Sequence, residues 1–250
     1  MTPRITVAVA GRVLRQLRHD HRTVAMLLVL PCVVLTLLWW MFDGRELGFE
    51  SLGPPLLALI PFIVMFLVTS VTTLRERSSG TLERLLAMPT GKLDLLGGYA
   101  LAFGLVAAVQ SALVVVLCLW VLDLDVAGPA WMLTVVAVSD AVLGTALGLF
   151  VSAFAQTEFQ AVQFMPVVVI PQILLCGLFI ARDEMPQVLE AISNLLPLSY
   201  AVDAMTTVAT TTSDSFGGVD PSVWGDLAVV AGFAVAALTL GAATLRRRTA

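Results

Sequence analysis

Few side chains in this 250-residue sequence could carry out catalysis or hold a metal ion. The two histidines, His19 and His21, both precede the first apolar run, and the three cysteines lie singly inside apolar runs. Isolated cysteines in odd number do not indicate a disulfide framework or a metal site. The Gly-x-Ser-x-Gly elbow of a serine hydrolase is also missing, which argues against an enzyme such as an intramembrane protease. We therefore predict no catalytic residue, no metal site and no cofactor held by this chain.

Asp140 is the only acidic residue well inside an apolar run. A carboxylate within a membrane costs at least a few kcal/mol, so such a residue is a candidate for binding a cation or relaying a proton. Asp140 also begins an i+4 series with Gly144, Gly148 and Ser152, a pattern typical of closely packed membrane helices. We favour a buried, hydrogen-bonded packing role over the functional one, because a relay would need a second titratable group.

A candidate substrate path follows from prolines and soft apolar residues. Pro61, Pro166 and Pro171 interrupt two apolar runs, and prolines kink membrane helices and free backbone carbonyls. Methionine and aromatic side chains beside them form adaptable apolar surface. Contact with lipid or with neighbouring helices would explain most of these side chains equally well. The candidate path residues are Phe62, Met65, Phe66, Phe164, Met165 and Gln172.

The elements that must position these residues are long apolar helices. Hydrophobic residues make up 58% of the chain and charged residues 13%, whereas a soluble domain is nearer half and a quarter. The net charge of −4 gives no global basic field, so we exclude a nucleic-acid partner. A membrane span needs about 20 mostly apolar residues. The chain is thus predicted to be an all-α integral membrane protein with spans at 23–42, 55–74, 97–122, 130–155, 161–181 and 227–245.

The basic residues predict the orientation of these spans. With the N-terminus inside, twelve of the 14 Lys and Arg residues fall on the cytoplasmic side, and only Arg45 and Arg182 fall outside. Such an excess of cytoplasmic Lys and Arg sets membrane topology. We therefore predict that both termini are cytoplasmic. The inner basic residues are Arg4, Arg12, Arg15, Arg18, Arg22, Arg75, Arg77, Arg84, Lys92, Arg246, Arg247 and Arg248.

Two segments flank the predicted spans. Residues 1–22 contain an amphipathic helix, with apolar residues on one side and arginines on the other, typical of an interfacial helix on the inner leaflet. It serves as an anchor for the first span, as a lever between that span and a cytoplasmic partner, or as both. The outer segment 182–226 contains two short apolar-faced helices at about 186–196 and 198–208, each beside a proline. Residues 23–250 form the transmembrane domain.

The connection at 75–98 is too long to be a simple turn. Gly80 and Thr81 can start a helix, with Thr81 as its N-cap, and Pro89 ends it. Leu82, Leu85 and Leu86 place an apolar ridge on this short cytoplasmic helix, and such a ridge fits a groove on the same bundle or on another protein.

This loop resembles the signature of ABC-2-type transporter permeases. The motif residues are Arg75, Glu76, Arg77, Gly80, Thr81, Glu83, Leu85, Leu86 and Pro89. A second stretch is similar to the Asn-Pro-x-x-Tyr-x-x-Asp-Ala pattern of the same family, carried here by Asn194, Pro197, Tyr200 and Asp203, with two leucines inserted after the asparagine. Within this family, the sequence most resembles bacterial drug and antibiotic exporters of the daunorubicin-resistance type.

The resemblance implies that the loop helix is a coupling helix, which docks, with Arg84 and the motif residues, on a separate ATP-hydrolysing subunit. This chain has no phosphate-binding loop, since Leu86 occupies the position of the glycine required upstream of Gly91-Lys92. The resemblance thus places ATP and Mg on two copies of a partner subunit. It also implies a second permease chain, identical or related, and a bacterial cytoplasmic membrane.

We therefore predict a permease subunit of an ATP-driven exporter that moves a hydrophobic or amphiphilic small molecule, such as a drug, antibiotic or lipid-like compound. Export of a polysaccharide or lipid-linked glycan is the alternative within this class. The tryptophans cluster near the predicted outer interface, as in an ordinary aromatic belt, which favours an apolar cargo. An ion-coupled carrier is the alternative from another class, and the isolation of Asp140 argues against it.

Overall fold

The computed structural model describes residues 3–42, 48–78, 91–212 and 216–244. All regular structure in these ranges is helical: nine α-helices and two short 3-10 helices. The 3-10 helices are Arg182–Glu184 and Phe216–Gly218. The α-helices are α1 (Pro3–His19), α2 (His21–Phe42), α3 (Phe49–Ser78), α5 (Lys92–Trp120), α6 (Ala130–Ser152), α7 (Glu158–Leu175), α8 (Gln187–Ser193), α9 (Pro197–Thr210) and α10 (Pro221–Thr244).

Six helices of the described part, α2, α3, α5, α6, α7 and α10, are long and apolar enough to cross a membrane. This confirms the predicted number of spans, and the chain is a multi-pass membrane protein. Five helix ends differ from the prediction by more than three residues, and the first is the start of α3 at Phe49 rather than at residue 55. α3 extends through Ser78 and α5 begins at Lys92, so the connection between them is shorter than 75–98. The predicted coupling helix, with Gly80, Thr81, Glu83, Arg84, Leu85, Leu86 and Pro89, falls in 79–90, outside the described residues.

The other two differences have local causes. α7 ends at Leu175 rather than near residue 181, and Gly177 just beyond it adopts a φ of 93°, which an L side chain rarely tolerates. α10 begins at Pro221, earlier than residue 227, since the Asp220 carboxylate accepts a hydrogen bond from the Ser222 backbone N–H at 2.9 Å. A capping aspartate followed by proline is a strong helix start.

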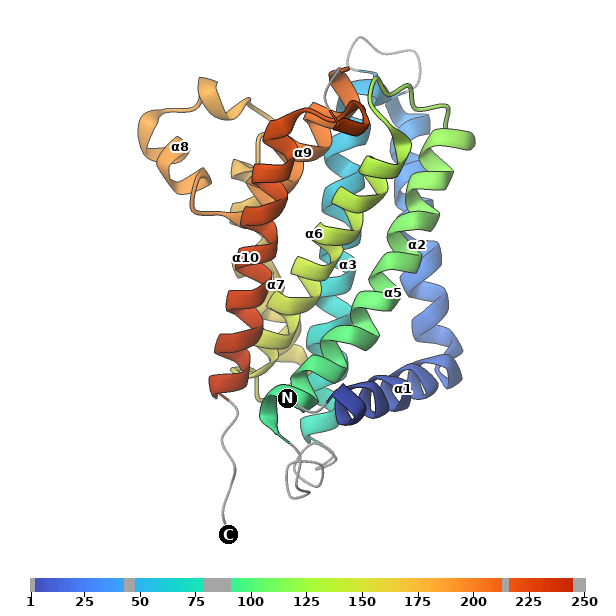
Figure 1. Cartoon of the computed structure of the whole chain (residues 1–250), viewed down its shortest axis with the longest axis vertical. Coiled ribbons are helices and arrows are strands. Elements are labelled where there is room, and N and C mark those ends of the chain that lie inside the picture. The colour runs from blue at the N-terminus through green and yellow to red at the C-terminus, as the bar shows by residue number, and fades with distance from the viewer. Residues whose placement is uncertain (1–2, 43–47, 79–90, 213–215, 245–250) are drawn as a thin grey trace.

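α6 lies at the centre of the bundle and packs against α3, α5, α9 and α10 (Figure 1). Its close contact with α3 depends on glycine. A Cβ on Gly144 would come within 2.4 Å of the Phe62 carbonyl oxygen, and one on Gly148 within 2.5 Å of the Phe66 carbonyl oxygen. The small-residue stripe of this helix is therefore confirmed as a packing face. Close approach of this kind is a main source of attraction between membrane helices.

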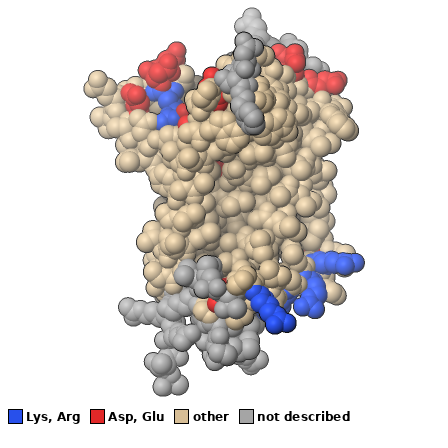
Figure 2. Space-filling view, viewed as in Figure 1, with Lys and Arg blue, Asp and Glu red and all other residues tan. Residues whose placement is uncertain are grey.

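The two ends of the bundle differ in charge. α1 lies across one end, at the bottom of Figure 1, where α10 also ends, and α9 lies at the other end. On the face drawn in Figure 2, basic side chains gather beside α1 and acidic ones at the α9 end, with a broad uncharged belt between them. Trp40, Trp120, Trp131 and Trp224 stand at helix ends on the α9 side, all exposed. This arrangement matches an apolar belt with an aromatic edge.

Candidate functional site

The structure brings polar residues together at three levels of the bundle. At the α1 end, Arg12 contacts the last turns of α3 and the start of α5. Arg12 Nη2 donates to Glu76 Oε2 at 2.8 Å and to the Tyr99 hydroxyl at 2.8 Å, and that hydroxyl donates to the same Glu76 oxygen. The Arg12 guanidinium also lies 6.0 Å from the centre of the Tyr99 ring. One side chain of α1 thus joins two spanning helices that are consecutive in the chain.

Burial makes this contact matter energetically. The Glu76 side chain is 5% exposed and that of Arg12 30%, and Tyr99 is buried. A buried carboxylate is tolerated only with a counter-charge and hydrogen bonds, which Arg12 and Tyr99 supply. Glu76, one of the predicted motif residues, is thus paired within the chain.

Arg75, the neighbouring motif residue, points to a different helix. Its guanidinium Nε and Nη2 donate to Glu158 Oε1 and Oε2, each at 3.1 Å. Both side chains are about half exposed or more, so this bidentate ion pair adds little to the stability of the protein by itself. It does connect the end of α3 to the start of α7. Arg77 lies in the last turn of α3, and its side chain is outside the described part.

The middle level contains Asp140, completely buried in α6. Neither of its carboxylate oxygens has a hydrogen-bond partner within the described ranges. Gln110 of α5 is also fully buried with both ends of its amide unpaired there. The predicted packing position of Asp140 is confirmed, but the hydrogen bond expected to accompany it is absent from the described residues.

The candidate path residues do not share one surface. Phe62, Met65 and Phe66 are completely buried in the core of the chain, against α6 and its neighbours. Phe164 and Met165 of α7 are half-buried. Gln172 is buried, where its side-chain oxygen accepts from the Leu198 backbone N–H at 3.4 Å, and its nitrogen donates to the Val168 carbonyl. The role of these six residues in transport stays a prediction.

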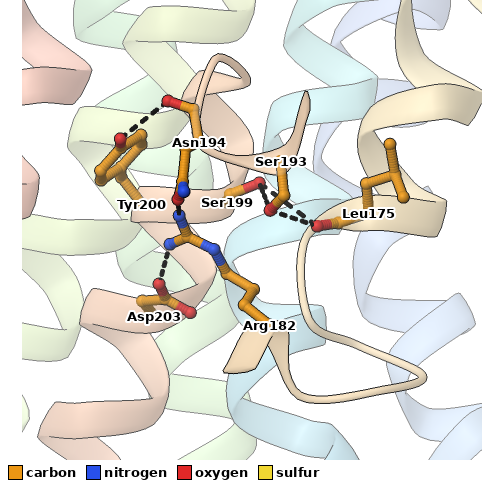
Figure 3. Close-up of polar contacts among 7 residues, drawn as sticks. All are labelled: Leu175, Arg182, Ser193, Asn194, Ser199, Tyr200 and Asp203. Atoms are coloured by element: carbon orange, nitrogen blue, oxygen red, sulfur yellow. Dashed lines mark hydrogen bonds and ion pairs between the residues drawn. The ribbon is translucent and has the colours of Figure 1, made fainter. Parts of the chain in front are cut away.

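At the α9 end, three of the four residues of the second motif, Asn194, Tyr200 and Asp203, meet around Arg182 (Figure 3). The Arg182 guanidinium donates to Asp203 Oδ2 and to Asn194 Oδ1, and its carbon lies 5.0 Å from the centre of the Tyr200 ring. The Tyr200 hydroxyl donates to the Asn194 carbonyl at 2.8 Å. Pro197 starts α9 at its first turn, where proline is well suited. The motif spacing therefore places these side chains around one cation.

Arg182 was not among the predicted site residues. Its position could have indicated a site, because Arg182 is one of only two basic residues predicted on the outer side. Burial raises the pKa of the Asp203 carboxyl, and the nearby Arg182 charge opposes that rise only in part. Behind this cluster, Ser193 and Ser199 both donate to the Leu175 carbonyl, at 2.7 and 3.4 Å, which fixes α8 and α9 to the end of α7.

Comparison with known proteins agrees with this architecture. Residues 4–209 match the ABC-2 type transporter family, so the chain belongs to that family, as its membrane permease and not as its ATPase. It is 29% identical over 150 residues to the probable multidrug ABC transporter permease YbhR of Escherichia coli, covering 60% of this chain and 41% of that protein.

Two further relatives are of the same kind. The inner membrane transport permease YhhJ of Escherichia coli is 31% identical over 151 residues, 58% of this chain and 40% of its own length. The linearmycin resistance permease protein LnrN of Bacillus subtilis is 23% identical over 150 residues, 60% of this chain and 39% of its own. The chain thus spans about two fifths of the length of the relatives that it matches.

Proposed function

We propose that this chain is the membrane-spanning subunit of an ATP-driven exporter that moves a hydrophobic or amphiphilic small molecule across a bacterial cytoplasmic membrane. Two copies of a separate ATP-binding subunit supply the energy, and a second permease chain, identical or related, completes the path. Both termini are cytoplasmic, and α1 lies on the inner leaflet. The names of its relatives, which include multidrug and linearmycin resistance permeases, support this class of cargo.

One observation carries the coupling part of this proposal. Arg12, Glu76 and Tyr99 join α1 to the end of α3 and the start of α5, and residues 79–90 connect these same two helices. A force applied to that connection by a partner would reach α1 directly through the ion pair. α1, α3 and α5 are rigid helices joined by a buried contact, so a movement of one of them can be transmitted to the others.

The apolar surfaces of several helices support the proposed class of cargo. α2, α7 and α10 expose apolar side chains along most of their length. Within the described part, no group of three or more metal-binding side chains occurs. Among the described spanning helices, Asp140 is the only acidic residue far from a helix end, whereas the buried Glu76 and Asp94 lie at span ends. One such group is a poor basis for an ion-coupled cycle.

Co-purification with the ATPase tests the class. The permease is expressed together with its ATP-binding partner subunit, and the tagged permease is isolated in detergent. Wild type is expected to retain the ATPase, while Leu85→Asp and Glu83→Lys reduce its recovery at equal membrane expression. Val188→Asp is the matched control, because Val188 is exposed in α8 at the opposite end. Equal recovery of ATPase with all three variants would refute the coupling assignment.

Cysteine labelling tests the orientation. Cys32, Cys118 and Cys176 are first replaced, and single cysteines are placed at Asp125 and at Arg18, both exposed at opposite ends. A membrane-impermeant reagent is expected to label position 125 in intact cells and position 18 only after lysis. Labelling of position 18 from outside would reverse the proposed orientation.

A further inference from the structure

A cavity of about 470 Å³ opens at the α1 end, between α1, α2, α3 and α5. It lies apart from Asp140, the Arg182 cluster and most of the predicted path residues. Its lining residues are Val13, Gln16, Leu17, Asp20, Thr23, Met26, Leu67, Val68, Val71, Thr72, Arg75, Glu76 and Phe103. The volume lies within the range of about 300–1,000 Å³ that is usual for small-molecule sites.

The inner wall of this cavity is apolar and built from buried side chains. Val13 and Leu17 of α1 and Phe103 of α5 are all buried. Val68 and Val71 of α3 are half-buried. On the α2 side, the lining residue Met26 is 70% exposed, so the cavity opens at that helix. Such a lining suits the hydrocarbon part of an amphiphile, and a methionine at the opening accommodates varied shapes.

The charges at the cavity favour a cation. Arg75 is paired with Glu158, and Glu76 is paired with Arg12. Asp20 forms no direct ion pair with a described side chain, although the Arg75 charge acts on it from a greater distance. It accepts hydrogen bonds from the Thr23 hydroxyl at 2.7 Å and the Thr23 backbone N–H at 3.2 Å. These hydrogen bonds lower the pKa of the Asp20 carboxyl, and the one from the Thr23 hydroxyl has the larger effect. The carboxyl is therefore ionised at neutral pH.

The arginines near Asp20 in sequence do not cancel this charge in the cavity. Arg15 and Arg18 lie on the side of α1 away from Val13 and Leu17, because successive helix residues are about 100° apart. Neither they nor Arg22 line the cavity, and all three are exposed to solvent. Asp20 and Arg75 are thus the charged groups at the exposed part of the lining, and Arg75 is already held by Glu158.

We propose that this cavity binds an amphiphile with a protonated amine head and an apolar body, with the amine at Asp20 and the body against Val13, Leu17 and Phe103. The role of this site in export rests on the proposed function. Binding of an amphiphile in the cavity does not depend on that function. The amine is carried either by a cargo molecule or by an amine-bearing membrane lipid such as phosphatidylethanolamine.

Binding is measured on the full-length chain in phosphatidylcholine nanodiscs, with a pyrene-labelled dodecylamine and its neutral N-acetyl derivative as probes. Asp20→Asn keeps an oxygen that can cap α2 but removes the charge. We expect it to weaken binding of the amine roughly five-fold, the loss of one exposed ion pair, and to leave the acetylated probe unchanged. Asp125→Asn, exposed at the other end, is the matched control.

Filling the cavity provides a second arm. Val71→Trp should abolish saturable binding of both probes, and Met26→Trp, at an exposed position that folding does not depend on, should weaken it. Val116→Trp, exposed on α5 and not part of the lining, should have no effect. Unchanged amine binding in Asp20→Asn and Met26→Trp, or equal affinity of wild type for the two probes, would overturn the proposal.

Two further measurements separate the sources and the two proposals. If a membrane lipid is the occupant, replacing half of the phosphatidylcholine by phosphatidylethanolamine weakens wild-type binding of the amine probe. If only a cargo uses the site, that replacement has no effect. Amine binding that depends on Asp20, without ATP-dependent efflux, supports the site and refutes the exporter. Efflux without such binding supports the exporter and refutes the site.

Discussion

The Glu76 carboxylate at the end of α3 pairs with Arg12 of α1 at 2.8 Å, although 64 residues separate them in the sequence. Tyr99 of α5 closes the contact by donating to the same carboxylate oxygen. Three helices are therefore joined at one buried point beside the connection that carries the family motif. Loss of any of the three side chains should affect the position of α1 before it affects the rest of the bundle.

Glu76→Gln is expected to destabilise this end of the protein. The substitution leaves the Arg12 guanidinium partly buried without its counter-charge, and since that side chain is 30% exposed, we expect a cost of about 1–3 kcal/mol, less than for a fully buried pair. Thermal unfolding in detergent and ATP-dependent efflux measure the effect. Arg15→Gln, exposed on the same helix, should change neither.

A double-mutant cycle distinguishes a direct pairing from two separate effects. Arg12→Gln combined with Glu76→Gln should cost less than the two single changes added together, with an interaction energy of about 0.5–3 kcal/mol. Additive single effects would show that the contact does not stabilise the protein.

Gly144→Ala should disrupt the packing of α3 against α6. The added Cβ would lie 2.4 Å from the Phe62 carbonyl oxygen, a backbone atom that cannot move without shifting α3. Overpacking of this kind costs about 1–3 kcal/mol. Gly232→Ala in α10, with nothing within 4 Å of the new Cβ, is the control. A lower melting temperature for the first variant alone confirms the close contact, and equal melting temperatures contradict it.

Asp140→Asn should leave transport intact. The substitution preserves the shape of the side chain, and the Asp140 oxygens have no hydrogen-bond partner among the described residues to lose. Efflux of a cationic and a neutral fluorescent substrate is compared at matched expression, with Asp125→Asn as the exposed control. Selective loss of the cation would instead make Asp140 a charged group of the path.

The pair of Asp203 and Arg182 predicts a pH dependence. Burial raises the pKa of Asp203 above its ordinary value of 3.8, so the folded chain binds this proton more tightly than the unfolded chain does. Stability contributed by this group is therefore present below pH 3.8 and declines as the pH rises through the raised pKa. Relative to Asp203→Asn, the melting temperature of the wild type should fall as the pH rises above 3.8. A constant difference between the two would contradict this assignment.

Arg182→Gln tests the same cluster from its other partner. Since the arginine charge lowers the pKa of Asp203, its removal should raise that pKa further and enlarge the loss of stability with rising pH. Asn194, which is exposed, also loses this donor, so we expect an additional cost of about 0.5–1 kcal/mol at neutral pH. Arg182→Lys, which retains the charge but not the two-pronged geometry, should lie between wild type and Arg182→Gln in its pH dependence.

Much of the fold was predictable because hydropathy and periodicity are local properties of a chain. Six apolar runs of spanning length, the amphipathic pattern of residues 4–22 and the small-residue stripe from Asp140 to Ser152 each lie within a single helix. Helix ends were less predictable, since they depend on caps and on single glycines, as at Asp220 and Gly177. The motif spacing from Asn194 to Asp203 also marked a site, because helix geometry places those residues close together.

Contacts between residues that are far apart in the sequence were decided only by the tertiary structure. The sequence alone determined that Glu76 is charged, that Phe62 and Phe66 are apolar, and that Arg182 is an isolated cation on its side. Packing of α1 against α5 decided that Glu76 meets Arg12, and packing of α3 against α6 decided that the two phenylalanines face the core. Packing of α8 and α9 on the end of α7 decided that Arg182 joins Asn194, Tyr200 and Asp203. The reason is physical: a local pattern specifies which side of a helix is apolar, whereas the rotation and approach of two helices depend on the shapes of both.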